Sequence, residues 1–265
     1  MTKPPHGFDL NSWFHDGRHD MMAAAMILTR IPVPWPEDLT PNTARSYWAF
    51  PLIGIAVAIL PVFFGTTLAA SGLPLMAAAA VMLLGIILLT GGLHQDGLAD
   101  LADGLGGRDA QHRLQIMRDS SIGSFGTLAL IIFTMITIAC LMQIGAHDLT
   151  LMAQSMMAVA AMSRGMMGLQ RWLHPTPDKE GLAAVTGQPE RNVMIIGMVI
   201  SFLLGAIFLS ISHVLGMMAV GVLITLLLGR FMMSWLGGVN GDGLGATQQC
   251  TEATMLMALT IMLAA

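Results

Sequence analysis

Long apolar runs alternate with short polar segments along most of the chain, which is the pattern of helices that cross a membrane. A membrane-spanning helix needs about 20 mainly apolar residues, and six runs approach or reach that length. The last apolar segment, 253–265, is only about 20 Å long as a helix and predicts a partial seventh span. We therefore expect an all-α, polytopic integral membrane helical bundle, with six full spans at residues 51–71, 74–93, 125–145, 150–169, 193–211 and 214–234.

The N-terminal region has a different pattern. Its first twenty residues are polar, and the apolar stretch at 21–29 is too short to span before Pro32 and Pro34 end it. This pattern predicts a cytoplasmic arm over residues 1–50 with an interfacial helix at 21–29. No cleavable signal peptide is apparent. Since no separate soluble region stands out, we expect residues 1–265 to form one membrane-embedded domain.

Composition supports a membrane protein and excludes some functions. The chain is 55% hydrophobic and only 11% charged, whereas soluble domains carry about 25% charged residues. The net charge of −4 gives no electrostatic case for binding nucleic acid. The two cysteines, Cys140 and Cys250, match no metal-ligand spacing and are interpreted as small packing residues.

Basic residues are confined to one side of this predicted topology. If the N-terminus is cytoplasmic, the segments after the second, fourth and sixth spans are cytoplasmic too, whereas the turns near Gly72, His147 and Ser212 carry no Lys or Arg. This is the positive-inside pattern. Among the acids only Asp148 falls outside, so we expect a cytoplasmic-facing active site. Beyond the N-terminal arm, the cytoplasmic basic residues are Arg108, Arg113, Arg118, Arg164, Arg171, Lys179, Arg191 and Arg230.

The segment GGLHQDGLADLADGLGG, residues 91–107, carries Asp96, Asp100 and Asp103 directly after the second predicted span. Their spacing of i, i+4, i+7 places them within about 60° of each other on a helix. Carboxylates so close repel each other beside a membrane, so we expect a cation between them. Oxygen ligands favour Mg²⁺, often shared with substrate phosphates. The alternative is a solvated acidic loop paired with the arginines that follow. His94 is a candidate ligand or proton carrier. The alternative is a histidine that is only hydrogen-bonded at a helix end.

The next polar segment contains two arginines, Arg113 and Arg118, followed by a Gly/Ser turn that opens the third predicted span. Arginines and free N–H groups at a helix start bind phosphate, although the same residues equally suit a positive-inside anchor with a helix cap. In the loop after the fourth span, Lys179 is a further candidate for holding phosphate, against the alternative of a plain solvated loop.

Residues 240–252 repeat the Asp-Gly-Leu of the first acidic segment, again just past the cytoplasmic end of a predicted span. This similarity predicts a second wall of one site, where Asp242 completes the metal shell. Three polar side chains that follow it are then candidates for contacts with substrate, namely Gln248, Gln249 and Glu252. The alternative is a glycine-rich loop that caps a short helix.

Together these motifs resemble the cobalamin synthase family, adenosylcobinamide-GDP ribazoletransferase. Two positions depart from the family's pattern: Gln95 stands where an apolar residue is usual, and Ser121 where a cation is usual, so Arg118 or Arg113 would take over a phosphate role there. The similar blocks come in the family's order and cover nearly the whole chain, at residues 28–34, 50–54, 91–104, 116–126 and 241–249.

The resemblance implies a late step of cobalamin biosynthesis. The family joins adenosylcobinamide-GDP to α-ribazole or α-ribazole 5′-phosphate, releases GMP, and uses Mg²⁺ in the bacterial inner membrane. Its acidic motif maps onto Asp96, Asp100 and Asp103, and Asp103 would be either a metal ligand or the base that orients the attacking hydroxyl. The expected partners are these small molecules and membrane lipid. A homo-oligomer and association with other enzymes of the pathway are left open.

Two alternatives from other classes remain at this stage. A membrane phosphotransferase of the CDP-alcohol type also begins its motif with Asp-Gly and repeats acids at helical spacing around a metal. An ion-coupled transporter would also carry acids and broken helices, but near the middle of the membrane rather than at its cytoplasmic edge.

Overall fold

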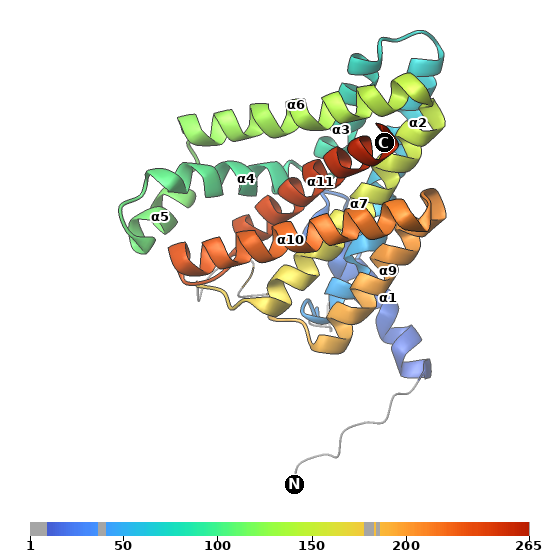
Figure 1. Cartoon of the computed structure of the whole chain (residues 1–265). Coiled ribbons are helices and arrows are strands. Elements are labelled where there is room, and N and C mark those ends of the chain that lie inside the picture. The colour runs from blue at the N-terminus through green and yellow to red at the C-terminus, as the bar shows by residue number, and fades with distance from the viewer. Residues whose placement is uncertain (1–9, 37–40, 178–182, 184–185, 265) are drawn as a thin grey trace.

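The computed structural model describes residues 10–36, 41–177, 183 and 186–264, and within them every regular element is a helix (Figure 1). Lys179 lies outside the described residues. The elements are α1 (Leu10–Leu28), the short 3₁₀ helix η1 (Arg45–Ala49), α2 (Phe50–Ala70), α3 (Leu75–Thr90), α4 (Leu93–Asp103), η2 (Gly104–Gly106), α5 (Ala110–Met117), α6 (Ser124–His147), α7 (Leu149–Leu173), α9 (Arg191–Phe208), α10 (Ile211–Leu236) and α11 (Gly241–Ala264).

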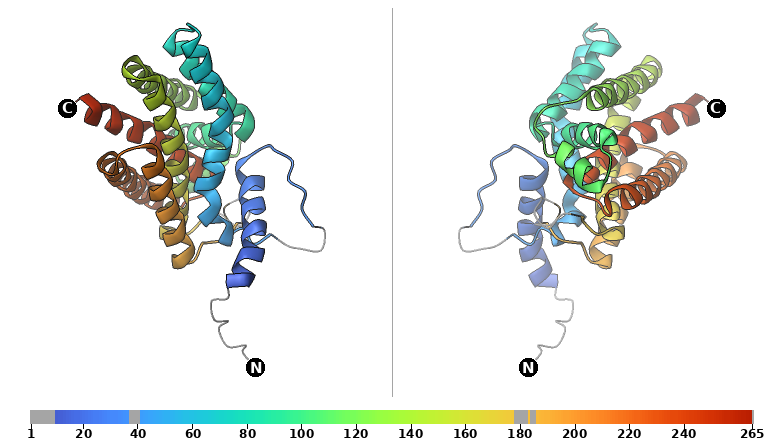
Figure 2. Two further views of the ribbon diagram at one scale, coloured as in Figure 1. Left: turned by 90° about the vertical axis from the view of Figure 1, so that its right-hand side faces the viewer. Right: turned by 90° about the vertical axis from the view of Figure 1, so that its left-hand side faces the viewer.

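Helix α7 is the central element of the bundle. Residues 155–168 are buried without interruption, because α2, α6, α9, α10 and α11 all pack against it. Small residues and methionines fill this interface, and unbranched methionine adapts well to irregular gaps between helices. By contrast, α1 lies at the periphery, beside the start of α2 (Figure 2).

Within the part of the chain that the structure describes, four helical stretches are long and apolar enough to cross a membrane: Arg45–Ala70, which joins η1 to α2, and α6, α9 and α10. Counting the bent pair α3 and α4 as one stretch makes five. Large apolar side chains on the outside of these helices face away from the protein, as lipid-facing residues do. They include Phe64, Leu88, Met135, Leu203 and Ile207.

The span predicted at 74–93 is shorter than expected. Helix α3 has 16 residues and ends at Thr90, so it is about 24 Å long. Gly91 and Gly92 both adopt positive φ angles, which end a helix at little cost only for glycine. The chain then turns by 90° into α4. Because of this turn, the acidic segment runs across the bundle instead of continuing along α3.

Two other predicted boundaries were wrong. The helix predicted at 21–29 begins at Leu10, because the polar residues before it are also helical. The polar segment that follows Asn240, for which a glycine-rich loop was the alternative, and the short last segment predicted at 253–265 form one continuous helix, α11, of 24 residues. Glycine lowers helix propensity by only about 1 kcal/mol, and burial against α4, α7 and α10 outweighs that cost.

Helices α7 and α11 are long enough to cross a membrane but are less apolar than the four stretches. Both carry buried polar residues, among them Arg164 in α7 and Glu252 in α11. Neighbouring helices surround these residues, so the two helices do not need a continuous apolar surface.

Candidate functional site

Two glycines bring the acidic helix α4 against the first turns of α11. A Cβ atom on Gly97 would lie 2.7 Å from the carbonyl oxygen of Asp242 and 2.9 Å from its Cα atom. One turn along α11, a Cβ atom on Gly245 would lie 3.2 Å from the Cα atom of His94. Only glycine permits backbones to approach so closely. The two Asp-Gly-Leu motifs, 146 residues apart in sequence, therefore lie side by side.

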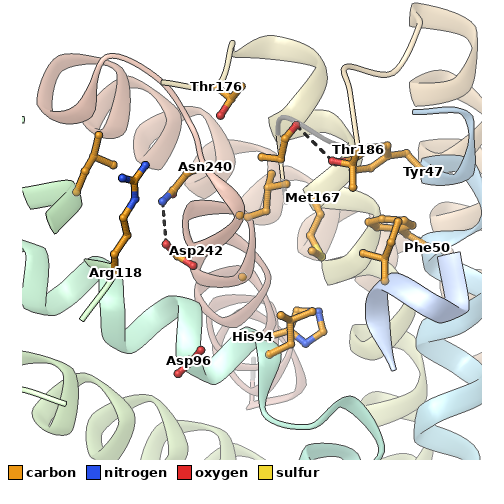
Figure 3. Close-up of a pocket in the computed structure, with 17 residues that line it drawn as sticks. Tyr47, Phe50, His94, Asp96, Arg118, Met167, Thr176, Thr186, Asn240 and Asp242 are labelled. Atoms are coloured by element: carbon orange, nitrogen blue, oxygen red, sulfur yellow. Dashed lines mark hydrogen bonds between the residues drawn. The ribbon is translucent and has the colours of Figure 1, made fainter. Parts of the chain in front are cut away.

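A cavity of about 340 Å³ opens beside this contact (Figure 3). It is lined mainly by ends of helices, namely the last turn of α1, the starts of α2, α4 and α11, and the last turns of α5 and α7, together with η1 and residues that follow α7, among them Thr176 and Thr186. One part of the wall is polar and contains Asp96, Arg118, Asn240 and Asp242. Another part is apolar and includes Ile27, Tyr47, Phe50, Leu114, Met167 and Leu244.

Asn240 fixes the start of α11 and the orientation of Asp242. Its side-chain oxygen accepts a hydrogen bond from the backbone N–H of Gly243 at 3.0 Å, as an N-cap residue does. Its Nδ2 atom donates to Oδ2 of Asp242 at 2.8 Å. Asp96 and Asp242 each lie in the first turn of their helix, where the helix dipole favours a negative charge.

Asp96 and Asp242 of the polar wall belong to a larger acidic cluster with Asp100 and Asp103 of α4, and α4 lies outside the four spanning stretches. Burial raises the pKa of Asp100, and the charges of Asp242, Asp96 and Asp103 raise it further, to about 7. Among the described residues, no three His, Cys, Asp or Glu side chains converge closely enough to form a complete metal site. The cluster thus holds a surplus of negative charge without a protein-built cage for a cation.

Asp103 is directed toward α6. Oδ2 accepts a hydrogen bond from the backbone N–H of Gly123 at 2.7 Å, and Oδ1 accepts one from Gly126 at 2.8 Å. The first N–H groups of a helix have no partner within the helix, so this carboxylate supplies one from another element. Asp103 therefore joins the end of α4 to the beginning of α6.

The two arginines predicted to bind phosphate occupy different environments. Arg118 lines the cavity. Arg113 instead donates from Nε to the carbonyl of Gly107 at 3.1 Å and from Nη1 to that of Trp235 at 2.8 Å. Its guanidinium also lies over the Trp235 ring, 4.8 Å from the centroid. Arg113 thus attaches α5 to α10.

The three polar residues predicted on the substrate side of α11 lie outside the cavity lining. The Nε2 atom of Gln248 donates to Glu252 at 2.7 Å and to Ser163 at 3.0 Å. The Nε2 atom of Gln249 donates in turn to Oε1 of Gln248 at 2.7 Å. Gln248 and Glu252 are buried between α7 and α11, near the buried Arg164. Their substrate contacts stay a prediction.

Among the other cavity residues, sequence reasoning singled out His94 but not Asn240, Tyr47 or Phe50. Asn240 had a usable signal, since Asn directly before a helix start is a common N-cap. Tyr47 and Phe50 had none, because aromatic residues at the start of a span usually pack or face lipid. Their rings pack together with centroids 4.5 Å apart, and the Tyr47 hydroxyl lies 3.2 Å from Oγ1 of Thr186.

Comparison with known proteins places these features in context. A family described as Cobalamin-5-phosphate synthase matches residues 20–260. An Azorhizobium caulinodans protein named adenosylcobinamide-GDP ribazoletransferase is 36% identical over 251 residues, covering 91% of this chain and 95% of the relative. Proteins of the same name from Rhizobium johnstonii and Escherichia coli K12 are 37% and 35% identical, over 91% and 89% of this chain and 95% and 97% of their own lengths. No solved structure matches the chain.

Proposed function

The chain belongs to the cobalamin-5-phosphate synthase family, and from this premise we propose that it joins adenosylcobinamide-GDP to α-ribazole or α-ribazole 5′-phosphate. A ribose hydroxyl oxygen of the α-ribazole unit forms a bond to the phosphorus that carries the cobinamide aminopropanol. The bond between that phosphorus and the oxygen of the GMP phosphate breaks. GMP leaves, the hydroxyl loses its proton, and adenosylcobalamin or its 5′-phosphate is formed.

The observation that carries this proposal is the pair of aspartates from two helices, Asp96 and Asp242, in one cavity with Arg118. Phosphoryl transfer depends mainly on in-line positioning and on neutralising charge. Arg118 supplies positive charge for phosphate oxygens. Asn240 orients Asp242 through its 2.8 Å hydrogen bond. The cavity thus offers both a cation site and an anion contact.

The donor set fits Mg²⁺ shared with substrate. Mg²⁺ is usually bound through one or two carboxylates, substrate phosphates and water, and needs no complete protein cage. Asp96 and Asp242 would supply those carboxylates, with Asp100 close enough to act electrostatically. When bound, the ion would neutralise charge on the diphosphate. In this proposal Asp103 acts as a positioning residue, since both its oxygens accept backbone hydrogen bonds.

The cavity is too small to enclose the corrinoid. Pockets of about 300–1,000 Å³ enclose drug-sized ligands, and this cavity lies at the lower end of that range. The adenosylcobinamide ring system is much larger than a drug-sized ligand. We therefore infer that the cavity holds the diphosphate region while the corrinoid lies outside it.

For the membrane arrangement, we propose that α7 and the second half of α11 also lie within the bilayer, shielded by the helices around them. The full spans are then α2, α3, α6, α7, α9 and α10. The N-terminus and the cavity would face the cytoplasm of a bacterial inner membrane. The distribution of Lys and Arg supports this orientation, because Arg118 lines the cavity and the turns near Gly72, His147 and Ser212 carry neither residue type.

The position of the acids supports an enzyme over a transporter in this proposal. The cavity is lined mainly by the ends of helices and not by their middles, as a site at the membrane edge requires. The deciding experiment incubates the purified protein with adenosylcobinamide-GDP, α-ribazole 5′-phosphate and Mg²⁺. Release of GMP with formation of the cobalamin phosphate supports the proposal. Absence of both products from a correctly inserted protein would overturn it.

A further inference from the structure

His94 is a buried polar side chain that lines the cavity and has an unpaired ring nitrogen. It lies in the first turn of α4 and is 1% exposed. Among the described residues, its Nε2 atom has no hydrogen-bond partner. Figure 3 shows its ring at the cavity, on the same helix as Asp96. The expectation of a histidine that is simply hydrogen-bonded at a helix end therefore does not describe this nitrogen.

An unpaired buried nitrogen is costly. Leaving a buried donor or acceptor unsatisfied costs about 1–3 kcal/mol, and native proteins contain few such groups. An unsatisfied group of this kind is retained where a bound ligand or water supplies the missing hydrogen-bond partner, or where the group has a function. Because His94 lines the cavity, a ligand bound there can supply the partner.

The backbone at His94 is held against α11. A Cβ atom on Gly245 would lie 3.2 Å from the His94 Cα atom and 3.3 Å from its carbonyl oxygen, so the two helices touch at this point. Two residues later on the same helix, Asp96 lines the polar wall. A ligand held by Asp96 and Asp242 would therefore lie in the same cavity as the His94 side chain, whose backbone is fixed against α11.

The charges around His94 select the class of ligand. The guanidinium of Arg164 in α7 is fully buried and acts electrostatically on His94. A nearby positive charge disfavours a metal ion at the imidazole and favours an anionic oxygen. A neutral imidazole can carry its proton on Nε2 and donate it in a hydrogen bond.

We propose that His94 donates a hydrogen bond from Nε2 to a phosphate oxygen of the nucleoside diphosphate group held in this cavity. This inference rests on the proposed function, since it assigns the contact to the GDP portion of that substrate. His94 thereby positions the diphosphate from the part of the cavity where the charge of Arg164 acts on its ring, while Asp96 and Asp242 hold the cation.

Two variants separate a ligand contact from a packing role. In His94→Gln the side-chain amide can place its nitrogen near the position of Nε2, whereas in His94→Asn the shorter amide reaches only the position of Nδ1. Binding of GDP with Mg²⁺ is measured on the purified protein in detergent. We expect His94→Asn to weaken GDP binding about 10- to 100-fold, as for a lost hydrogen bond to a charged group. His94→Gln should retain binding closer to that of the unaltered protein.

A matched control is His147→Asn, at the exposed end of α6 and outside the cavity lining. It should bind GDP as the unaltered protein does. Equal GDP affinity in His94→Asn and the unaltered protein would overturn the inference. So would equal weakening in the Asn and Gln variants together with an equal loss of thermal stability, because that pattern indicates packing alone.

Turnover separates this inference from the proposed function. If the unaltered protein releases GMP, kcat/KM for adenosylcobinamide-GDP should fall in His94→Asn, while KM for α-ribazole 5′-phosphate stays unchanged. If it releases no GMP, the proposed function fails, and the GDP-binding comparison still decides the role of His94.

Discussion

The carboxylate of Asp103 in α4 accepts a hydrogen bond from the backbone N–H of Gly126 in the first turn of α6, at 2.8 Å. A second bond, from Gly123, occupies the other carboxylate oxygen. The third aspartate of the acidic segment therefore has a role that its spacing from Asp96 and Asp100 did not reveal. It fixes the end of α4 relative to α6 and so positions the helix that carries the other two.

We expect Asp103→Asn to lower stability without changing the Mg²⁺ requirement. An amide oxygen accepts one of the two hydrogen bonds, while the amide nitrogen faces the other N–H group. The expected cost is about 1–3 kcal/mol, as for loss of a hydrogen bond to a charged group. Unfolding in mixed micelles measures it, and GMP release is followed over a range of Mg²⁺ concentrations. Unchanged stability with a much higher Mg²⁺ requirement would instead identify Asp103 as a metal ligand.

Removing either aspartate of the cavity should abolish most turnover. We expect Asp96→Asn and Asp242→Asn each to slow GMP release by about 100- to 1,000-fold, because charge stabilisation by a metal contributes several kcal/mol. The matched control is Asp148→Asn, which removes an equal charge from the N-cap of α7 outside the cavity. Near-normal turnover in Asp96→Asn, with the protein inserted in the membrane, would exclude the metal assignment.

Stability without metal should depend on pH through Asp100. Its pKa in the folded protein, about 7, is above the ordinary aspartate value of 3.8. The folded state therefore binds the proton more tightly than the unfolded state does, and stability is lost as pH rises through about 7. In a chelator, we expect a lower melting temperature at pH 8 than at pH 6.

The Asp100→Asn variant supplies the control for that dependence, because its side chain does not titrate. The difference in melting temperature between pH 6 and pH 8 should therefore be smaller in Asp100→Asn than in the unaltered protein. Addition of Mg²⁺ at pH 8 should stabilise the unaltered protein, since a bound cation offsets the repulsion among the carboxylates. A melting temperature that rises from pH 6 to pH 8 in chelator would contradict the assignment.

The close contact of α4 with α11 can be tested at Gly97. The Cβ atom of Gly97→Ala would lie 2.7 Å from the carbonyl oxygen of Asp242, so one helix must move and Asp96 and Asp242 must separate. We expect a loss of about 1–3 kcal/mol in stability, typical of overpacking, together with slower GMP release. Gly106→Ala is the control, because a Cβ atom there meets nothing within 4 Å. Equal activity of the two variants would show that this contact does not position the site.

The fold class followed from the sequence because lipid imposes a simple local rule. Apolar runs of sufficient length must be helical to satisfy their backbone groups, so the all-helical class and the approximate positions of α2, α6, α9 and α10 were correct. The same rule missed the end of α3. Gly91 and Gly92 turn the chain at that point. A hydropathy pattern does not show a change of chain direction, so the predicted span continued past the end of the helix.

The order of residues establishes which chemical groups this protein has and beside which apolar runs they stand. It also indicates that Asp242 belongs with the acidic segment, because the two motifs share residue types. Which of these groups face one cavity follows from the packing of the helices. Asp103 and Arg113 bond to backbone groups of other helices, whereas Asp96, Arg118 and Asp242 line the cavity with His94. The reason is that helical spacing fixes only which face a side chain occupies, while the partner of that face depends on how distant helices pack.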